Sequence, residues 1–259
     1  MTHPARFDLT GIGNAIVDVL TRVDDRFLDK QAMRKGSMTL IDAKAAEALY
    51  AAMPAGIEAS GGSVANSCAV AAGLGARVAF LGKVAEDQLG EVFRHDMRAM
   101  GVTFPTAPMT GAGPTARCLV LVTPDGQRTM HTHLGIAGEF TEADLDEEVI
   151  AQSAILYLEG YLFDPLPAQA AFRRAARIAR QAGRRVALSL SDAFCVDRHR
   201  EGFRELIREG VDILFANETE ICSLFERDRF DDAAAEAAEA VPLAVLTQGE
   251  SGSVIIGNG

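Results

Sequence analysis

The alternation of short apolar runs with helix-like segments constrains the fold of this chain more than any other feature. Apolar runs recur along the sequence as FDLTGIG, RVAFLGKV, AILYLEG, RRVALSL, VDILFAN and LAVLTQG, with segments such as PAQAAFRRAARIARQAG between them. Such runs are typical of buried strands, and the intervening segments are typical of helices. The pattern predicts an α/β fold with a mostly parallel central sheet and helices on both faces. Ligands of such a sheet bind beyond the carboxyl ends of its strands.

Two stretches interrupt this alternation. Residues 115–133 indicate two strands joined by a turn at Pro124-Asp125-Gly126, which predicts a hairpin rather than a crossover. The stretch from residue 18 to 42 is a second irregular excursion and ends in KGSMTLID. We expect one domain over residues 1–259, in which lid segments at approximately 18–42 and 110–133 form a small β lobe above the ligand edge.

Acidic residues outnumber basic ones, and this limits the classes of partner. The chain has 25 Lys and Arg against 36 Asp and Glu, a net charge of −11, which disfavours a protein that grips a nucleic-acid backbone. Four cysteines without C-x-x-C spacing are typical of a reduced, cytoplasmic protein. The sequence also shows neither a secretory signal nor an apolar run of membrane-spanning length. We therefore expect a cytoplasmic protein with a small-molecule ligand and with no nucleic-acid or membrane partner.

Small and polar residues follow the first predicted strand and precede the first long helix. Asp18 can accept hydrogen bonds from the hydroxyl groups of a ligand, although a solvated loop carboxylate is an equal alternative. Gly61-Gly62 allows a backbone to approach a ligand closely, and the helix start that follows offers free N–H groups. A simple tight turn explains the two glycines equally well.

The run VDILFAN stops abruptly at Asn217-Glu218-Thr219-Glu220. Asn217 and Glu220 are three residues apart and would share a face on the first turn of a helix. Their side chains suit two interpretations: a carboxylate that holds hydrated Mg²⁺ beside phosphate-binding groups, or a capping box that only starts the helix. Thr247 and Gly249 follow the next strand and suit contact with a phosphate or nucleotide.

Two further motifs favour simpler interpretations. His131 and His133 would lie on one face of a strand and could bind Zn²⁺, but no third ligand follows at a useful spacing, so we favour polar packing in the lid. Gly11-x-Gly13 lacks the third glycine and the downstream acid of a dinucleotide-binding motif, which disfavours a dehydrogenase.

Taken in order, GIGNAIVD, SGGSVANS, KGSMTLID, LVLVTPDGQRTM, VDILFANETE and VLTQGESG resemble the PfkB carbohydrate kinase family, the ribokinase-like kinases, and most of all its adenosine kinase branch. The resemblance implies a ribokinase-like three-layer sandwich with a small β lid. It also implies ATP-dependent, Mg²⁺-assisted transfer of the γ-phosphate to a primary hydroxyl, with adenosine as the first candidate substrate. A free-sugar kinase of the ribokinase or fructokinase type and a non-catalytic nucleoside- or sugar-binding protein remain alternatives.

The resemblance also implies individual roles. Contacts with the sugar ring are implied for Asn14, Asp18, Gly61, Gly62 and Asn66. The base, or another apolar part of the substrate, would lie against Met38, Leu40 and either Tyr161 or Phe163. Phosphate contact is implied for Arg128, ATP contact for Asn217, Thr247 and Gly249, and Mg²⁺ binding through water for Glu220. Members of the family occur as monomers and as homodimers, and the sequence favours neither.

The chain departs from the family pattern in three places. Met38 stands in the adenine pocket where the family pattern leads us to expect a polar residue. Ser189-Leu190-Ser191 stands where the adenosine kinase branch usually has Asn-Leu-Ser. The family's G-A-G-D motif, whose Asp is the general base, is not reached by Gly259, so we expect that catalytic residue beyond Gly259 and regard the chain as a piece of a longer protein. Thr110-Gly111-Ala112-Gly113 is followed by Pro114 in place of Asp, and we interpret it as a loop.

Overall fold

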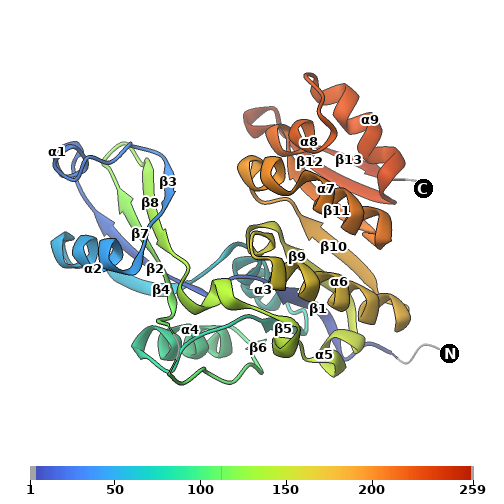
Figure 1. Cartoon of the computed structure of the whole chain (residues 1–259), viewed down its shortest axis with the longest axis horizontal. Coiled ribbons are helices and arrows are strands. Elements are labelled where there is room, and N and C mark those ends of the chain that lie inside the picture. Colours follow the sequence, from blue (N-terminus) through green and yellow to red (C-terminus); the bar gives the residue numbers. More distant parts are fainter. Residues whose placement is uncertain (1–3, 112, 258–259) are drawn as a thin grey trace.

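The computed structural model describes residues 4–111 and 113–257. The interpretations that concern Ala112 and Gly259 therefore lie outside the described residues. The strands form two separate sheets, and the smaller sheet projects from one side of the larger (Figure 1). This is an α/β ribokinase-like fold, as the sequence predicts.

The larger sheet has eight strands in the order β13-β12-β11-β10-β9-β1-β5-β6. Every neighbouring pair is parallel except β12 with β13. The strands are β1 (Phe7–Ile12), β5 (Val78–Leu81), β6 (Val102–Thr103), β9 (Ser153–Glu159), β10 (Arg185–Ser189), β11 (Ile213–Asn217), β12 (Leu243–Thr247) and β13 (Ser253–Gly257). Because the strand order reverses around β1, the carboxyl ends of β1 and β9 form a topological switch point, where open α/β sheets bind their ligands.

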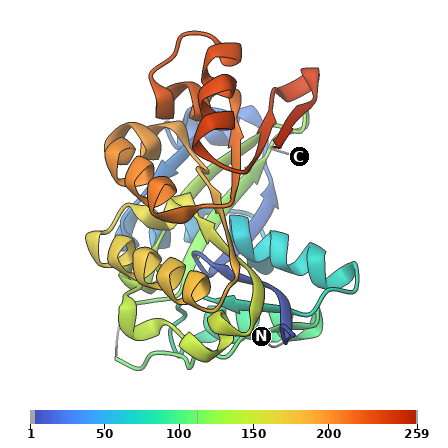
Figure 2. The same cartoon turned by 90° about the vertical axis from the view of Figure 1, so that its right-hand side faces the viewer.

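Helices cover this sheet on two sides and make it the middle of three layers. One face carries α5 (Glu147–Ala151), α6 (Leu166–Gln181), α7 (Ala193–Gly210), α8 (Glu218–Phe225) and α9 (Phe230–Ala240), and the other carries α3 (Ser63–Gly73) and α4 (Gln88–Ala99). Figure 2 shows α3 in cyan on the opposite side of the sheet from α6 and α7 in yellow and orange. Alternate residues of a strand enter the two cores, so Leu81 packs with one set of helices and Phe80 with the other.

The smaller sheet, here called the lid, has five strands in the order β3-β8-β7-β2-β4. They are β2 (Ile16–Arg22), β3 (Met38–Leu40), β4 (Ile57–Gly61), β7 (Ala116–Val122) and β8 (Arg128–His133). The predicted hairpin is confirmed: β7 and β8 are antiparallel, and Gly126 takes the left-handed backbone conformation in their turn. The lid extends past the expected residue 42, because β4 carries it on to Gly61.

Helices α1 (Asp25–Lys30) and α2 (Ala43–Ala52) cover one face of the lid. Val19 of β2 and Leu119 of β7 pack there against Leu49 of α2. Since successive side chains of a strand point to opposite faces, Asp18 and Leu20 lie on the other face, which α1 and α2 leave open.

Four short 3-10 turns complete the described chain: η1 (Gly135–Glu139), η2 (Glu142–Asp144), η3 (Gly160–Phe163) and η4 (Gly249–Ser251). All four cysteines are free. Within residues 4–111 and 113–257, no helix combines the length and the apolar character needed to cross a membrane.

Candidate ligand site at the carboxyl edge

The switch point of the large sheet is built around one buried carboxylate. Glu159 is the last residue of β9 and is 1% exposed. Its Oε1 accepts hydrogen bonds from the backbone N of Asn14 (3.1 Å) and from Asn14 Nδ2 (2.8 Å), and its Oε2 accepts one from the backbone N of Val64 (3.0 Å). The carboxylate therefore joins three segments: the end of β9, the link from β1 into the lid, and the first turn of α3. We call this arrangement the Glu159 junction.

Local chemistry explains why the junction accepts a carboxylate. The first N–H groups of a helix have no partner within the helix and carry partial positive charge, and Val64 supplies one of them. Burial raises the pKa of Glu159, while the hydrogen bonds from Val64 and Asn14 oppose that rise. A Cβ on Gly13 would lie 2.5 Å from Glu159 Oε2, so the position requires glycine. Sequence reasoning missed Glu159, whose only local signal is an acid at the end of the apolar run AILYLEG.

The predicted sugar-binding residues lie together beside this junction. A Cβ on Gly61 would lie 2.5 Å from the carboxylate carbon of Asp18, so the glycine makes room for that side chain. Gly62 has a φ of 102°, and a Cβ there would lie 2.4 Å from the backbone O of Asn14. Asn66 is exposed on the first turn of α3. The structure thus brings Asn14, Asp18, Gly61, Gly62 and Asn66 into one place where β1, the lid and α3 meet.

Asp18 has an unusual environment for a carboxylate. Burial raises its pKa to about 6, and the positive charge of Arg128 counteracts part of that rise. Arg128 pairs in register with Val122 of β7, and Val122 pairs with Arg22 of β2. Arg128 therefore lies on the same face of the lid as Asp18. From there its guanidinium group can interact with the Asp18 carboxylate and with a ligand bound on that face.

The apolar lid residues share this face as well. One row of register partners runs across all five strands through Ile57, Leu20, Val120, Met130 and Met38. The next row contains Ala59, Asp18, Cys118, Thr132 and Leu40. Register partners point to the same face of a sheet. The open face of the lid thus places the carboxylate of Asp18 directly beside an apolar strip, defined here as the first of these rows.

Of the two aromatic candidates in η3, only one can contact a ligand. Tyr161 is 37% exposed, and burial, together with the charges of Asp192, Glu220 and Glu159, raises its pKa to about 12. The assignment of Phe163 to a pocket wall is wrong. Phe163 is fully buried, with its ring stacked on Phe203 at a centroid distance of 4.4 Å. The ring fills the core between η3, α6 and α7, so no ligand can reach it.

The predicted nucleotide residues form a second group, at the ends of β11 and β12. Asn217 pairs in register with Thr247, and Gly249 follows in η4. Three strand spacings separate β11 from β1, which corresponds to about 14 Å. That distance leaves room for an acceptor hydroxyl at one group and a chain of phosphates reaching it from the other.

Asn217 and Glu220 form a complete capping box. The Asn217 side chain accepts a hydrogen bond from the Glu220 N (2.8 Å), and the Glu220 carboxylate accepts from the Asn217 N (2.9 Å) and from Nδ2 (2.7 Å). Glu220 is 6% exposed, and burial raises its pKa, as does the charge of nearby Asp192. The helix-start interpretation of this motif is therefore confirmed. Binding of Mg²⁺ would be a second role of the same Glu220 carboxylate.

The serines that replace the expected Asn-Leu-Ser lie between the two groups. Ser191 takes a left-handed backbone conformation with a φ of 68°, and Asp192 then caps α7 by accepting from the Cys195 N (3.0 Å). The histidine pair lies elsewhere, on the helix-covered face of the lid, where His133 Nδ1 is 3.3 Å from the backbone O of Ile41. Across the described part of the chain, no group of three or more His, Cys, Asp or Glu is arranged to hold a metal.

Comparison with known proteins agrees with this geometry. Residues 38–259 match the pfkB family of carbohydrate kinases. The structure of an adenosine kinase from Sinorhizobium meliloti is 50% identical, with a TM-score of 0.90 over 97% of this chain and 77% of that one. A probable sugar kinase from Rhizobium etli CFN 42 is 46% identical, with a TM-score of 0.91 over 98% and 77%. Guanosine-inosine kinase of Escherichia coli K12 is 25% identical over 96% of this chain, which spans 60% of that protein's length.

Proposed function

The chain belongs to the pfkB family of carbohydrate kinases, and from this premise we propose that the intact protein transfers the γ-phosphate of ATP to a primary hydroxyl of adenosine, forming AMP. A nucleoside has two chemically different halves, a ribose with hydroxyl groups and a planar base with large apolar faces. The site has to recognise both halves and to align the ribose with the phosphate donor.

One observation carries the choice of a nucleoside over a free sugar. The open face of the lid places the Asp18 carboxylate next to the apolar strip of Ile57, Leu20, Val120, Met130 and Met38. Asp18 and the backbone around Gly61 and Gly62 suit the ribose hydroxyls. The strip suits the base, since pockets for such ligands combine apolar walls with a few placed polar groups. A free sugar would have no group to place on the strip.

The described residues support catalysis by positioning and charge neutralisation. Asp18 accepts hydrogen bonds from ribose hydroxyls, and the Glu159 junction fixes the backbone around it. Asn217, Thr247 and Gly249 contact ATP. Arg128 neutralises phosphate charge from the lid side. We assign the general base to none of these carboxylates, because Glu159 and Glu220 both accept hydrogen bonds and Asp18 is assigned to the sugar.

The residues near the nucleotide group fit a hydrated Mg²⁺. Burial and the charge of nearby Asp192 raise the pKa of Glu220, so a cation between the two carboxylates would relieve their repulsion. Mg²⁺ keeps several waters and is held through one or two carboxylates plus substrate phosphates. Glu220 would hold it through water, since both carboxylate oxygens already accept from Asn217. When bound, the ion neutralises charge on the transferred phosphate.

The test is a panel of ligands titrated into the intact protein by calorimetry, followed by an assay of phosphate transfer from ATP. Adenosine should bind more tightly than guanosine and inosine, and far more tightly than ribose or fructose, and it should be converted to AMP. Tighter binding of a free sugar would replace the proposal with a sugar kinase. Tight binding of adenosine without transfer would indicate a binding protein.

A further inference from the structure

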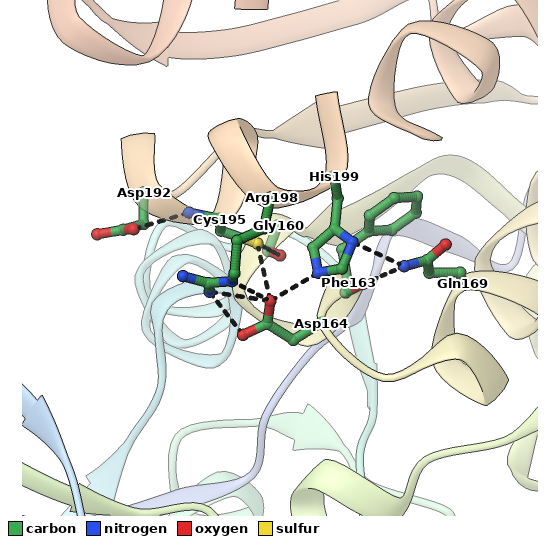
Figure 3. Close-up of polar contacts among 8 residues, drawn as sticks. All are labelled: Gly160, Phe163, Asp164, Gln169, Asp192, Cys195, Arg198 and His199. Atoms are coloured by element: carbon green, nitrogen blue, oxygen red, sulfur yellow. Dashed lines mark hydrogen bonds and ion pairs between the residues drawn. The ribbon is translucent and has the colours of Figure 1, made fainter. Parts of the chain in front are cut away.

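A cluster of polar side chains ties the η3 turn to the first part of α7, and its residues do not belong to either candidate group (Figure 3). Asp164 follows η3, and its carboxylate accepts from Arg198 Nε (3.1 Å), from Arg198 Nη2 (2.8 Å to Oδ2) and from His199 Nε2 (2.9 Å). Both donors are on α7. A single carboxylate thus holds two consecutive residues of a helix that begins at the carboxyl edge.

The helix is broken at the position that Asp164 holds. His199 has φ and ψ of −125° and 23°, which are not helical, so α7 consists of a front segment, Ala193–Arg198, and a longer rear segment. The backbone hydrogen-bond ladder of a helix normally fixes the direction of each turn relative to the next, and a kink interrupts that control. The direction of the front segment therefore depends on side-chain contacts, among them the charge-assisted hydrogen bonds of Arg198 to Asp164 and the bond from His199.

The neighbouring Gln169 of α6 determines which ring nitrogen of His199 accepts a hydrogen bond and which donates one. Gln169 Nε2 is 2.9 Å from the backbone O of Phe163 and 3.3 Å from His199 Nδ1. A carbonyl oxygen can only accept, so this Gln169 atom is the amide nitrogen, and its second hydrogen points to Nδ1. Nδ1 then accepts, Nε2 carries the proton, and that proton is donated to Asp164. Both ring nitrogens of His199 are used, and they join α6, α7 and the residue after η3.

The front segment and η3 together carry two exposed aromatic rings at the carboxyl edge. Phe194 on the first turn of α7 is 74% exposed, and Tyr161 of η3 is partly exposed. The two segments also contact each other directly, because the Cys195 thiol donates to the backbone O of Gly160 (3.3 Å). A Cβ on Gly160 would lie 2.3 Å from the Leu190 O, so η3 lies tightly against the end of β10.

We propose that Asp164, Arg198, His199 and Gln169 form a clamp that positions Tyr161 and the front segment of α7 for the nucleoside; this inference rests on the proposed function. The clamp residues do not touch the substrate. They hold the two aromatic rings in the orientation that the bound nucleoside needs. Without the clamp, binding has to order the front segment, and this lowers the affinity for adenosine. The nucleotide group at the ends of β11 and β12 contains none of the four clamp residues, although Asp192 at the start of the front segment lies near Glu220. Loss of the clamp should therefore weaken adenosine binding much more than ATP binding.

Two substitutions at His199 separate the role of each ring nitrogen. In His199→Gln, the amide nitrogen reaches close to the position of Nε2 and can still donate to Asp164. In His199→Asn, the shorter side chain reaches only to the position of Nδ1, so it can meet Gln169 but not Asp164. The matched control is Arg173→Gln, which removes the ion pairs of α6 with Glu205 and Glu209 on the rear segment of α7.

The experiment measures, for the intact wild type and the three variants, the dissociation constants of adenosine and of ATP by calorimetry and the melting temperature. His199→Asn should weaken adenosine binding about tenfold, because the free energy needed to order one or two side chains and a short segment corresponds to about that change in affinity. The loss of ATP affinity should be much smaller. His199→Gln should restore most of the adenosine affinity, and Arg173→Gln should match the wild type for both ligands.

The possible results separate the clamp from the proposed function. Wild-type affinity for adenosine in His199→Asn would overturn the clamp alone, as would a parallel loss of adenosine and ATP affinity. An equal loss of adenosine affinity in Arg173→Gln would also overturn it, because general loosening of α6 against α7 would then explain the effect. A wild type that binds ATP but no nucleoside would overturn the proposed function and the clamp with it.

Discussion

Two asparagine–glutamate pairs lie at strand ends of the large sheet. In both, the glutamate carboxylate accepts hydrogen bonds from the backbone and side chain of the asparagine, but the two pairs differ in how far apart their residues are in the sequence. Asn217 and Glu220 are 3 residues apart and form a capping box at the start of one helix. Asn14 and Glu159 are 145 residues apart, and Glu159 also binds the first turn of α3. The local pair stabilises the helix in which it lies. The distant pair joins the two sheets, so the shape of the sugar-binding group depends on it.

The comparison is sharpest when both glutamates are changed to glutamine, and the largest expected effect is on the distant pair. Glu159→Gln should lower the free energy of unfolding by about 2–4 kcal/mol, because the new NH₂ group must face a buried N–H of either Asn14 or Val64, and leaves it without an acceptor. Urea denaturation followed by circular dichroism measures the change. A loss below about 1 kcal/mol would mean that the junction relaxes without cost.

The next largest effect concerns Asp18, which depends on the junction for its position. Asp18→Ala should weaken adenosine binding by about 1–3 kcal/mol, since the substrate hydroxyl loses its acceptor. Calorimetry on the intact protein gives this value, and a melting temperature no lower than that of the wild type would show that the fold is retained. Retained affinity for adenosine would remove Asp18 from the sugar-binding group.

The raised pKa of Asp18 predicts a pH dependence of both adenosine affinity and stability. Burial raises the pKa of Asp18 to about 6. Asp18 has to be ionised to accept hydrogen bonds from the ribose hydroxyls, and the ionised fraction falls about tenfold between pH 7 and pH 5. Adenosine affinity should therefore fall about tenfold over the same range. The stability of the ligand-free protein should depend on pH in the opposite direction, with the Asp18 contribution greatest at low pH. A carboxyl whose folded pKa exceeds its unfolded value stabilises the fold at low pH, and that contribution is lost as pH rises through about 6.

Asp18→Asn is the matched control for this titration. Its adenosine affinity should be weaker than that of the wild type at pH 7 and nearly constant down to pH 5. Its melting temperature should exceed that of the wild type at pH 7, where the wild-type carboxylate is charged in a buried place. A profile for Asp18→Asn that still falls below pH 6 would assign the titration to another group.

The smallest effect on stability is expected at the local pair. Glu220→Gln should change the free energy of unfolding by about 0.5 kcal/mol or less, because the amide oxygen of glutamine also completes a capping box. The new NH₂ group would face Asn217 Nδ2, and because Asn217 is exposed, that group can bond to water instead. If Glu220 holds Mg²⁺ through water, the variant should need more Mg²⁺ for half-maximal phosphate transfer, because a neutral amide attracts a hard cation less than a carboxylate does. Coincident curves of rate against Mg²⁺ concentration would leave Glu220 with the capping role alone.

The same difference in scale explains what could be predicted from the sequence. The hairpin with its turn at Pro124-Asp125-Gly126 and the helix start at Asn217 are set by residues a few positions apart, and both are confirmed. The parallel sheet follows from apolar runs whose pattern is also local. The Glu159 junction was not predicted, because a glutamate at the end of a strand has no local sign of the asparagine that it will meet.

The choice between Tyr161 and Phe163 shows a second limit. Both follow the same strand within four residues, and the sequence offers no reason to prefer one. In the structure, η3 turns the chain so that Phe163 enters the core against Phe203 while Tyr161 faces outward. That turn depends on the close approach of Gly160 to the end of β10, a tertiary contact that periodicity does not reveal.

We infer that the Glu159 junction shapes a nucleoside site and that the Asn217–Glu220 pair does not. The most direct measurement is a calorimetric titration of adenosine into the intact wild type, Glu159→Gln and Glu220→Gln, at a temperature at which all three are folded. We predict that Glu159→Gln weakens adenosine binding by about tenfold or more and that Glu220→Gln leaves it unchanged. Equal affinities for the wild type and Glu159→Gln, or an equal loss in both variants, would contradict the account.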